Sequence, residues 1–181
     1  MAVATQITTG KVRLSYVHVF EPRAIRETDK PKYSATLLIP KEDTTTITKI
    51  KNAIEAAKAV WSQNHNGAAA PQKTTLHDGD GVRPSDGQPF GAECKGHYVL
   101  TASSIRKPVL VYADKTPLTE PTELYSGCYG KAIINFYCYE APGNKGISAG
   151  LNGIMFLADG EPLAGGVIAD DDWDDEESDL L

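Results

Sequence analysis

The stretch from Leu124 to Glu140, LYSGCYGKAIINFYCYE, constrains the fold most, because its second half alternates between two dissimilar faces. From Gly130 onward one face is small and apolar, and it consists of Ala132, Ile134, Phe136 and Cys138. The opposite face is mixed, and it consists of Lys131, Ile133, Asn135, Tyr137 and Tyr139. A period of two residues is typical of a β-strand with one buried face. We therefore predict a long strand here, with Tyr137 and Tyr139 exposed.

The remaining pattern predicts short strands and a single helix. Strand-like segments are 10–20, 33–39, 97–102, 108–112 and 146–157. Asp43 or Thr44 can cap a helix that ends at Asn66-Gly67, and its buried stripe is expected at Ile47, Ile50, Ile54, Ala57 and Trp61. These elements favour a mainly β fold, an OB-fold-like small barrel with one amphipathic helix, although a sandwich with an added helix has the same pattern. In the first strand, Tyr16 and Phe20 share a face with Val12 and Leu14, so we expect both rings in the core.

Length and composition suit one domain. The 181 residues include 11 prolines and 16 glycines, which favour turns over a helical bundle. We predict a domain over residues 1–166, in which 67–96 is an irregular insertion without apolar periodicity. Residues 167–181 are predicted to form a disordered acidic tail.

The charge of the chain is divided unevenly. Residues 170–181 hold eight of the 24 acidic residues and none of the 18 Lys and Arg residues, so the remainder has 16 acids, 18 bases and a net charge of +2. A mildly basic body with a strongly acidic tail differs from a uniformly acidic protein, and this asymmetry is the most informative feature of the composition. The tail is either a solubilising segment or a docking segment, and in the second case the residues that a partner grips are Asp172, Trp173, Asp174, Asp175, Leu180 and Leu181. Such a tail also mimics single-stranded DNA and can compete with it for a basic groove.

Aromatic and basic residues are frequent along the predicted strands. Flat rings beside cations bind single-stranded nucleic acid, each stacked base contributing roughly 1–3 kcal/mol. The alternative for any single ring is a place in the core or in strand pairing. The candidate DNA-binding residues are Arg13, Lys32, Tyr33, Arg106, Lys107, Tyr125, Tyr129, Lys131, Tyr137 and Tyr139.

Catalytic signatures are missing from the sequence. It contains no GxxxxGK[ST], HExxH or GxSxG motif, so we predict no enzyme, no catalytic residue and no cofactor. Cys94, His97, Cys128 and Cys138 are zinc-type ligands at a spacing that matches no standard site. The run Asp78-Gly79-Asp80-Gly81 lacks the closing glutamate of a calcium loop and is expected to be a polar turn.

The compartment follows from what the sequence lacks. The start, MAVATQITTG, has no secretory pattern, and no apolar run is long enough to span a membrane. The three cysteines have no CxxC spacing, so reduced thiols and a cytoplasmic location are expected.

Five segments together resemble the tailed-phage single-stranded-DNA-binding proteins, a family once known only as a domain of unknown function. They span Val12 to about Gly166 and read VRLSYVHVFEP, KYSATLLIPKED, RKPVLVYAD, LYSGCYGKAIINFYCYE and GISAGLNGIMFLADGEPL. The resemblance implies an OB fold, sequence-independent binding of single-stranded DNA, and a role in phage DNA replication or recombination in the host cytoplasm. The tail looks like those that phage and bacterial single-strand binders offer to a polymerase, helicase or nuclease. It ends in Leu180-Leu181, where several related tails end in phenylalanine.

The sequence therefore predicts a non-enzymatic single-stranded-DNA-binding protein whose acidic tail recruits replication partners and competes with DNA. Two other classes stay open: a non-catalytic phage structural or interaction protein with a solubilising tail, and a metal-dependent nuclease. The absence of a clustered Asp, Glu and His constellation argues against the nuclease. A homodimer is also left open.

Overall fold

The computed structural model describes residues 5–24, 30–83, 86–141 and 144–163. The predicted tail lies outside these ranges, as do Trp173 and the terminal leucines. The described elements are β1 (Gln6–Thr8), β2 (Val12–Arg23), β3 (Lys32–Pro40), α1 (Thr44–Asn64), β4 (Leu76–Asp78), η1 (Ala92–Cys94), β5 (His97–Ser104), β6 (Val109–Val111), η2 (Pro121–Glu123), β7 (Tyr129–Ala141) and β8 (Asn144–Ala158).

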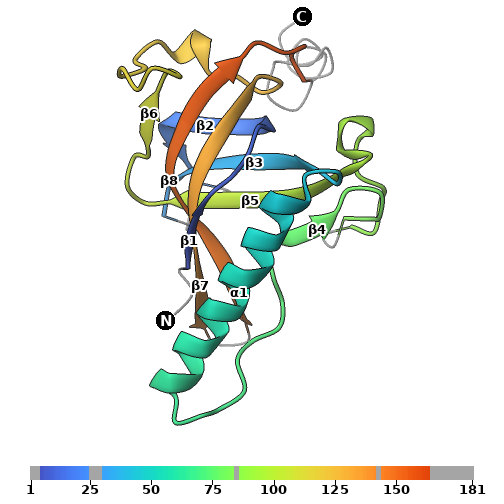
Figure 1. Cartoon of the computed structure of the whole chain (residues 1–181), viewed down its shortest axis with the longest axis vertical. Coiled ribbons are helices and arrows are strands. Elements are labelled where there is room, and N and C mark those ends of the chain that lie inside the picture. Colours follow the sequence, from blue (N-terminus) through green and yellow to red (C-terminus); the bar gives the residue numbers. More distant parts are fainter. Residues whose placement is uncertain (1–4, 25–29, 84–85, 142–143, 164–181) are drawn as a thin grey trace, which may run out of the picture.

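Five strands form a closed ring in the order β7, β2, β3, β5 and β8, and β8 pairs with β7 again (Figure 1). All neighbours are antiparallel except β5 and β8, which run parallel and meet at Ser103 and Gly150. The ring is not a regular barrel, because β5 and β8 share only that pair and β2 meets β7 at only two pairs. β1 extends the sheet at β7, β6 at β8 and β4 at β5. The predicted OB-like barrel is confirmed, and the sandwich is excluded.

The long strand β7 has the two faces that its sequence predicts. Ala132, Ile134 and Phe136 are buried in the main core, while Tyr137 is 41% exposed on the other face. Cys138 is half-buried, and its thiol donates to the carbonyl of Ala57 on α1 at 3.5 Å. Tyr139 is half-buried as well, so the prediction that it is exposed was wrong in part.

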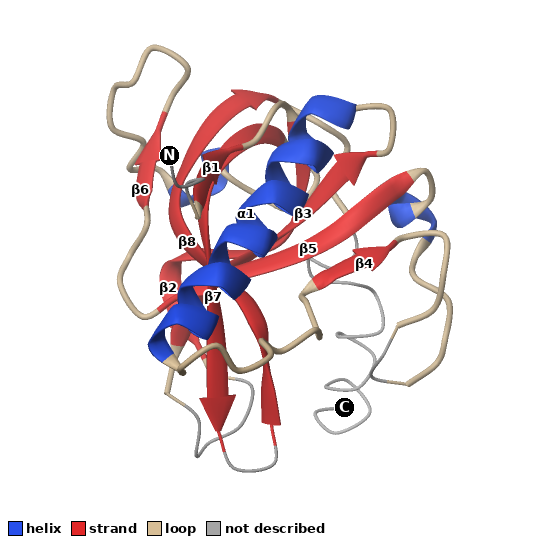
Figure 2. Ribbon diagram, turned by 60° about the horizontal axis from the view of Figure 1, so that its bottom comes forward, coloured by secondary structure: helices blue, strands red, loops and turns tan. Residues whose placement is uncertain are grey.

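Helix α1 lies across one side of the ring and contacts β7 and β1 (Figure 2). Asp43 caps the N-terminus of α1. One of its carboxylate oxygens accepts from the backbone amide of Thr46 at 3.1 Å, and the other accepts from the Thr46 hydroxyl at 2.6 Å. The predicted stripe is buried at Ile47, Ile50, Ile54 and Ala57. Trp61, however, is only half-buried, because the stripe leaves the core in the last turns of the helix.

The alternation predicted for β2 fails at Tyr16. The pairing of β2 with β3 shifts register between Ser15 and His18, and Tyr16 has a φ of +47° there. Such a β-bulge inserts one residue and exchanges the faces beyond it. Val19, beyond the bulge, is therefore buried, and Tyr16 at the bulge is 48% exposed, which corrects the prediction that the Tyr16 ring is in the core. Phe20 remains partly buried against the core.

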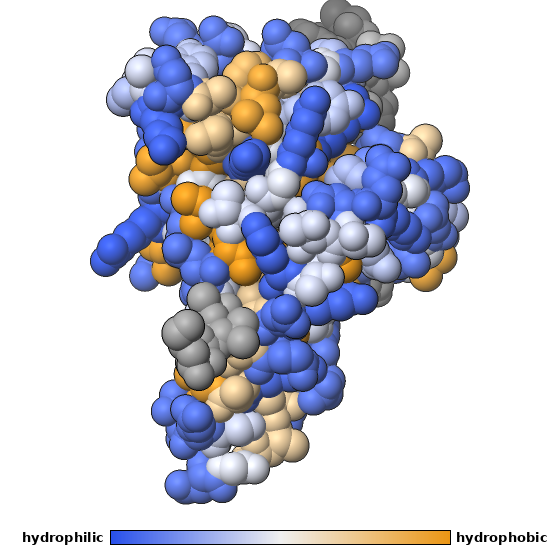
Figure 3. Space-filling model, in the orientation of Figure 1, coloured by the Kyte–Doolittle hydropathy of each residue, from blue (hydrophilic) through white to orange (hydrophobic). Residues whose placement is uncertain are grey.

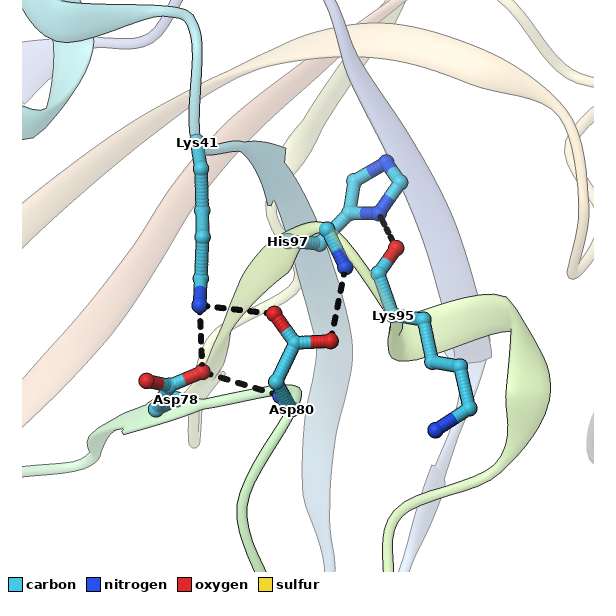
Figure 4. Close-up of polar contacts among 6 residues, drawn as sticks. Lys41, Asp78, Asp80, Lys95 and His97 are labelled. Atoms are coloured by element: carbon cyan, nitrogen blue, oxygen red, sulfur yellow. Dashed lines mark hydrogen bonds and ion pairs between the residues drawn. The ribbon is translucent and has the colours of Figure 1, made fainter.

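The predicted insertion 67–96 contains β4 and η1 and is held to the ring by ion pairs (Figure 4). Lys41, just after β3, contacts Asp78 at 2.6 Å and Asp80 at 2.7 Å. Asp80 also accepts from the Gly96 amide at 3.1 Å. The hydrogen bonds from Lys41 lower the pKa of both carboxyl groups, and both bonds raise the pKa of Lys41 itself. The run Asp78–Gly81 is thus the predicted polar turn, and it anchors the insertion.

Replacing Lys41 with Met should weaken this anchor in a pH-dependent way. Because the two carboxyl pKa values lie below their ordinary 3.8 in the folded chain, their contribution is present above that pH and is lost as the pH falls through the folded values. The free energy of unfolding of Lys41→Met should therefore be lower than that of the wild type at about pH 6, and the gap should narrow at about pH 3. Urea titrations at both pH values measure this, with Lys51→Met on the exposed face of α1 as the control. A gap that is the same at both pH values would contradict the ion-pair account.

Candidate nucleic-acid interface

A groove of about 350 Å³ opens on the outer face of the ring, where β3, β5, β7 and β8 come together. We call it the basic groove. Two cationic side chains and one aromatic ring line the basic groove: Lys32 at the start of β3, Arg106 just after β5 and Tyr137 on β7. The remaining lining is polar or small, apart from one aliphatic residue, and consists of Ser103, Ser104, Ile105, Asn135, Gly150 and Asn152.

Strand pairing explains why residues so distant in sequence meet in this groove. Gly150 of β8 lies opposite Asn135 of β7 and is also the residue at which β8 meets Ser103 of β5. Ser104 lies opposite Tyr33 of β3, which places the neighbouring Lys32 at the same edge. The groove therefore depends on the parallel contact between β5 and β8.

Glycine at position 150 keeps the floor of the groove low. A Cβ atom there would lie 3.8 Å from Cε1 of Tyr137 and 3.6 Å from the carbonyl oxygen of Asn135. A larger side chain would therefore fill the space in front of the tyrosine ring. With glycine, one edge of the exposed ring faces open space.

The groove suits an anionic polymer with flat bases. Its lining carries a lysine and an arginine, and no carboxylate belongs to it among the described residues. Cations take phosphates, an exposed ring can stack on any base, and amides and hydroxyls can bond base edges. Figure 3 shows that the face drawn there is mostly hydrophilic, with hydrophobic side chains in small groups, as is normal for a protein surface.

The structure does not bring all the candidate residues to this groove. Arg13 and Tyr129 form a separate cluster with Lys11: the lysine ammonium is 4.9 Å from the centroid of the Tyr129 ring, and the Arg13 guanidinium carbon is 5.8 Å from it. Arg13 also donates to the carbonyls of Gly127, at 3.2 Å, and Glu161, at 2.6 Å. Tyr129 precedes Tyr137 by eight positions on β7, which is roughly 26 Å along a strand.

Four further candidate residues do not line the basic groove and make other contacts. The Tyr125 hydroxyl bonds Asp159 at 3.0 Å and both backbone groups of Gly160, and burial raises its pKa. Tyr139 packs on Gly146, where a Cβ atom would lie 3.0 Å from its hydroxyl. The Lys107 ammonium is 5.5 Å from the centroid of the Phe20 ring. Lys131 lines a small, mainly apolar hollow between β1 and β6.

The sequence analysis did not identify the polar residues that complete the groove. Ser103, Ser104 and Asn152 carry no motif, and only the fold places them beside Tyr137. Asn135 shares the polar face of β7 with Tyr137, and this alternation was the one signal that could have marked it.

The described residues hold no group of three or more His, Cys, Asp or Glu side chains that is suited to a metal ion. Burial raises the pKa of Cys94 to about 11 and also raises the pKa values of Cys128 and Cys138. His97 contacts the Lys95 carbonyl at 2.8 Å. Within the described ranges, no helix combines the length and hydrophobicity that crossing a bilayer requires.

Comparisons with known proteins agree with the fold. The family described as "Enterobacter phage Enc34, ssDNA-binding protein" matches residues 5–181. The "putative protein p50" of Acyrthosiphon pisum secondary endosymbiont phage 1 is 33% identical over 189 residues, covering 97% of this chain and 98% of the relative.

Two solved structures show the same arrangement. The bacteriophage Enc34 single-stranded DNA-binding protein in complex with ssDNA is 31% identical, with a TM-score of 0.73 over 88% of this chain and 89% of that one. The single-stranded DNA-binding protein gp2.5 of bacteriophage T7 is 16% identical, with a TM-score of 0.57 over 94% and 93% of the two chains, which shows a shared fold alone. With the match along nearly its whole length, this chain belongs to the phage Enc34 single-stranded-DNA-binding protein family.

Proposed function

We propose that this protein binds single-stranded DNA without regard to sequence, and does so without catalysis, through the basic groove. The observation that carries the proposal is the meeting of Lys32, Arg106 and Tyr137 in one groove whose described lining holds no carboxylate. The Enc34 relative, whose structure was solved with ssDNA, supports it.

The chemistry of the groove explains why sequence would not matter. Lys32 and Arg106 attract the phosphates, which every nucleotide carries and which make the affinity salt-dependent. Tyr137 offers a π-face to whichever base lies over it. The edges of the bases meet amides and hydroxyls such as Asn152 and Ser103, which can donate or accept and therefore match any base.

We propose that only some of the candidate residues contact the DNA. Lys32, Arg106 and Tyr137 form its centre, and Tyr33 and Lys107 lie at positions adjoining two of them. Arg13, Tyr129 and Lys131 stand elsewhere on the molecule, and the hydroxyl of Tyr125 is occupied by bonds within the protein.

The acidic tail has a second part in the proposal. We infer that it recruits phage replication or recombination proteins in the host cytoplasm and competes with DNA in cis, with the domain ending near residue 166 and the tail following it. Its eight carboxylates and Trp173 support both roles, because they imitate a phosphate chain with a flat ring. An acidic segment that competes for cations loses that advantage when salt screens the charges.

Oligo-dT and duplex DNA of equal length test the function directly. We expect the full chain to bind oligo-dT more tightly than the duplex, because only unpaired bases can stack on Tyr137, and we expect the affinity to fall steeply as salt is raised. Fluorescence anisotropy at two salt concentrations measures both effects. Equal affinity for the two DNAs, or none at low salt, would instead favour a structural or interaction protein.

Tyr137→Ala should weaken oligo-dT binding by roughly 1–3 kcal/mol, about fivefold to 150-fold, because the ring that stacks is lost. Tyr137→Phe keeps the ring and should bind nearly as the wild type does. Anisotropy titrations measure the affinities, and circular dichroism verifies that both variants fold. If a folded Tyr137→Ala variant binds normally, the site lies elsewhere on the molecule.

Deleting residues 170–181 removes eight negative charges and should tighten oligo-dT binding, most clearly at low salt. The same deletion should abolish capture of replication proteins from an infected-cell extract. A version in which the eight acids are replaced by Asn and Gln separates charge from length, and it should bind DNA like the deletion. Unchanged DNA affinity and unchanged capture would together refute both roles of the tail.

A further inference from the structure

A second hollow, of about 580 Å³, lies between the last turns of α1 and β7. Its rim carries Val60, Trp61, Asn64 and His65 from the helix side. Asn135 and Tyr137 of β7 line this hollow and the basic groove alike, so the two are contiguous. We propose that this helix hollow is a second base-binding subsite, which receives the bases of single-stranded DNA beyond the nucleotide at Tyr137; the proposal rests on the function proposed above.

Aromatic stacking is already present at the rim of the helix hollow. The rings of Trp61 and His65 are stacked, with centroids 3.7 Å apart and planes 9° apart. His65 Nδ1 contacts the carbonyl oxygen of Trp61 at 2.7 Å, which holds the imidazole parallel to the indole. His65 is exposed, so a flat ligand can extend this stack. Bases stack on aromatic faces whatever their sequence.

The charge of the helix hollow favours bases over phosphates. Its described lining contains no lysine or arginine and one carboxylate, Glu140, together with the amides of Asn64 and Asn135. Phosphates would find no cation there, whereas neutral base edges can bond the amides. An acidic peptide, such as the tail of this chain, would meet the charge of Glu140 and is the less suitable occupant.

The position of Tyr137 joins the two sites. Its ring is 41% exposed, and it borders the basic groove on one side and the helix hollow on the other. A strand whose phosphates lie at Lys32 and Arg106 and whose base covers this ring can place its next nucleotides in the adjoining helix hollow, where Trp61 lies. OB folds bind about 4–16 nucleotides, so a strand of that length can fill both sites.

Oligonucleotide length and a local charge test the inference. Asn64→Asp adds a negative charge at the helix hollow, and Gln63→Glu adds the same charge to the same exposed end of α1 without lining the hollow. With the full chain, Asn64→Asp should weaken binding of oligo-dT of about 16 nucleotides on the order of tenfold relative to Gln63→Glu, and should leave binding of about 4 nucleotides unchanged.

Tryptophan fluorescence gives an independent readout. The chain has two tryptophans, Trp61 and Trp173, so Trp173→Phe leaves Trp61 as the sole reporter. We expect its emission to be quenched at saturation with the longer oligo-dT and not with the shorter. The inference is overturned if Asn64→Asp matches Gln63→Glu at both lengths, or if the emission of Trp61 is unchanged by the longer strand. If the unsubstituted chain binds neither oligonucleotide, the proposed function fails and the inference falls with it.

Discussion

The pairing of β7 with β8 is the interaction on which the rest of the molecule depends. It comprises thirteen residue pairs, from Tyr129 opposite Ala158 to Ala141 opposite Asn144. Its inner face contributes Phe136 and other core side chains. Its start at Tyr129 and Gly130 pairs with β2, and Gly150 in its middle pairs with β5, so the ladder closes the ring. The outer face of the same ladder carries Asn135 and Tyr137, so the contacts that stabilise the fold also fix the candidate interface.

Much of this fold could be predicted from local pattern. The period of two in β7 and the apolar stripe of α1 are physical requirements of a half-buried strand and a packed helix, and both were found where expected. The exposure of Tyr16 could not be predicted, because it follows from a bulge with a positive φ that no glycine marks. Trp61 was expected in the core because helical spacing gives the direction of a side chain and not the point at which the core ends.

The candidate site was harder to predict than the fold. Side-chain chemistry indicated Lys32, Arg106 and Tyr137, yet nothing in their spacing showed that these three would meet while Tyr129 would not. Their meeting depends on the parallel contact of β5 with β8, which is a property of topology. Residue type alone also could not separate tyrosines that are exposed to a ligand from tyrosines that hold the fold together. Tyr125 is the clearest case, because its hydroxyl is bonded to Asp159 and Gly160.

The contiguity of the basic groove and the helix hollow, which share Asn135 and Tyr137, has a consequence for affinity. When the first segment of a strand is held in the basic groove, the bases that follow are tethered within reach of the helix hollow. The second contact then becomes intramolecular, at an effective concentration in the millimolar range for a short flexible link. A hollow too weak to retain a free nucleotide would still lengthen the residence time of a long strand, and the protein would thereby favour extended unpaired DNA over short fragments.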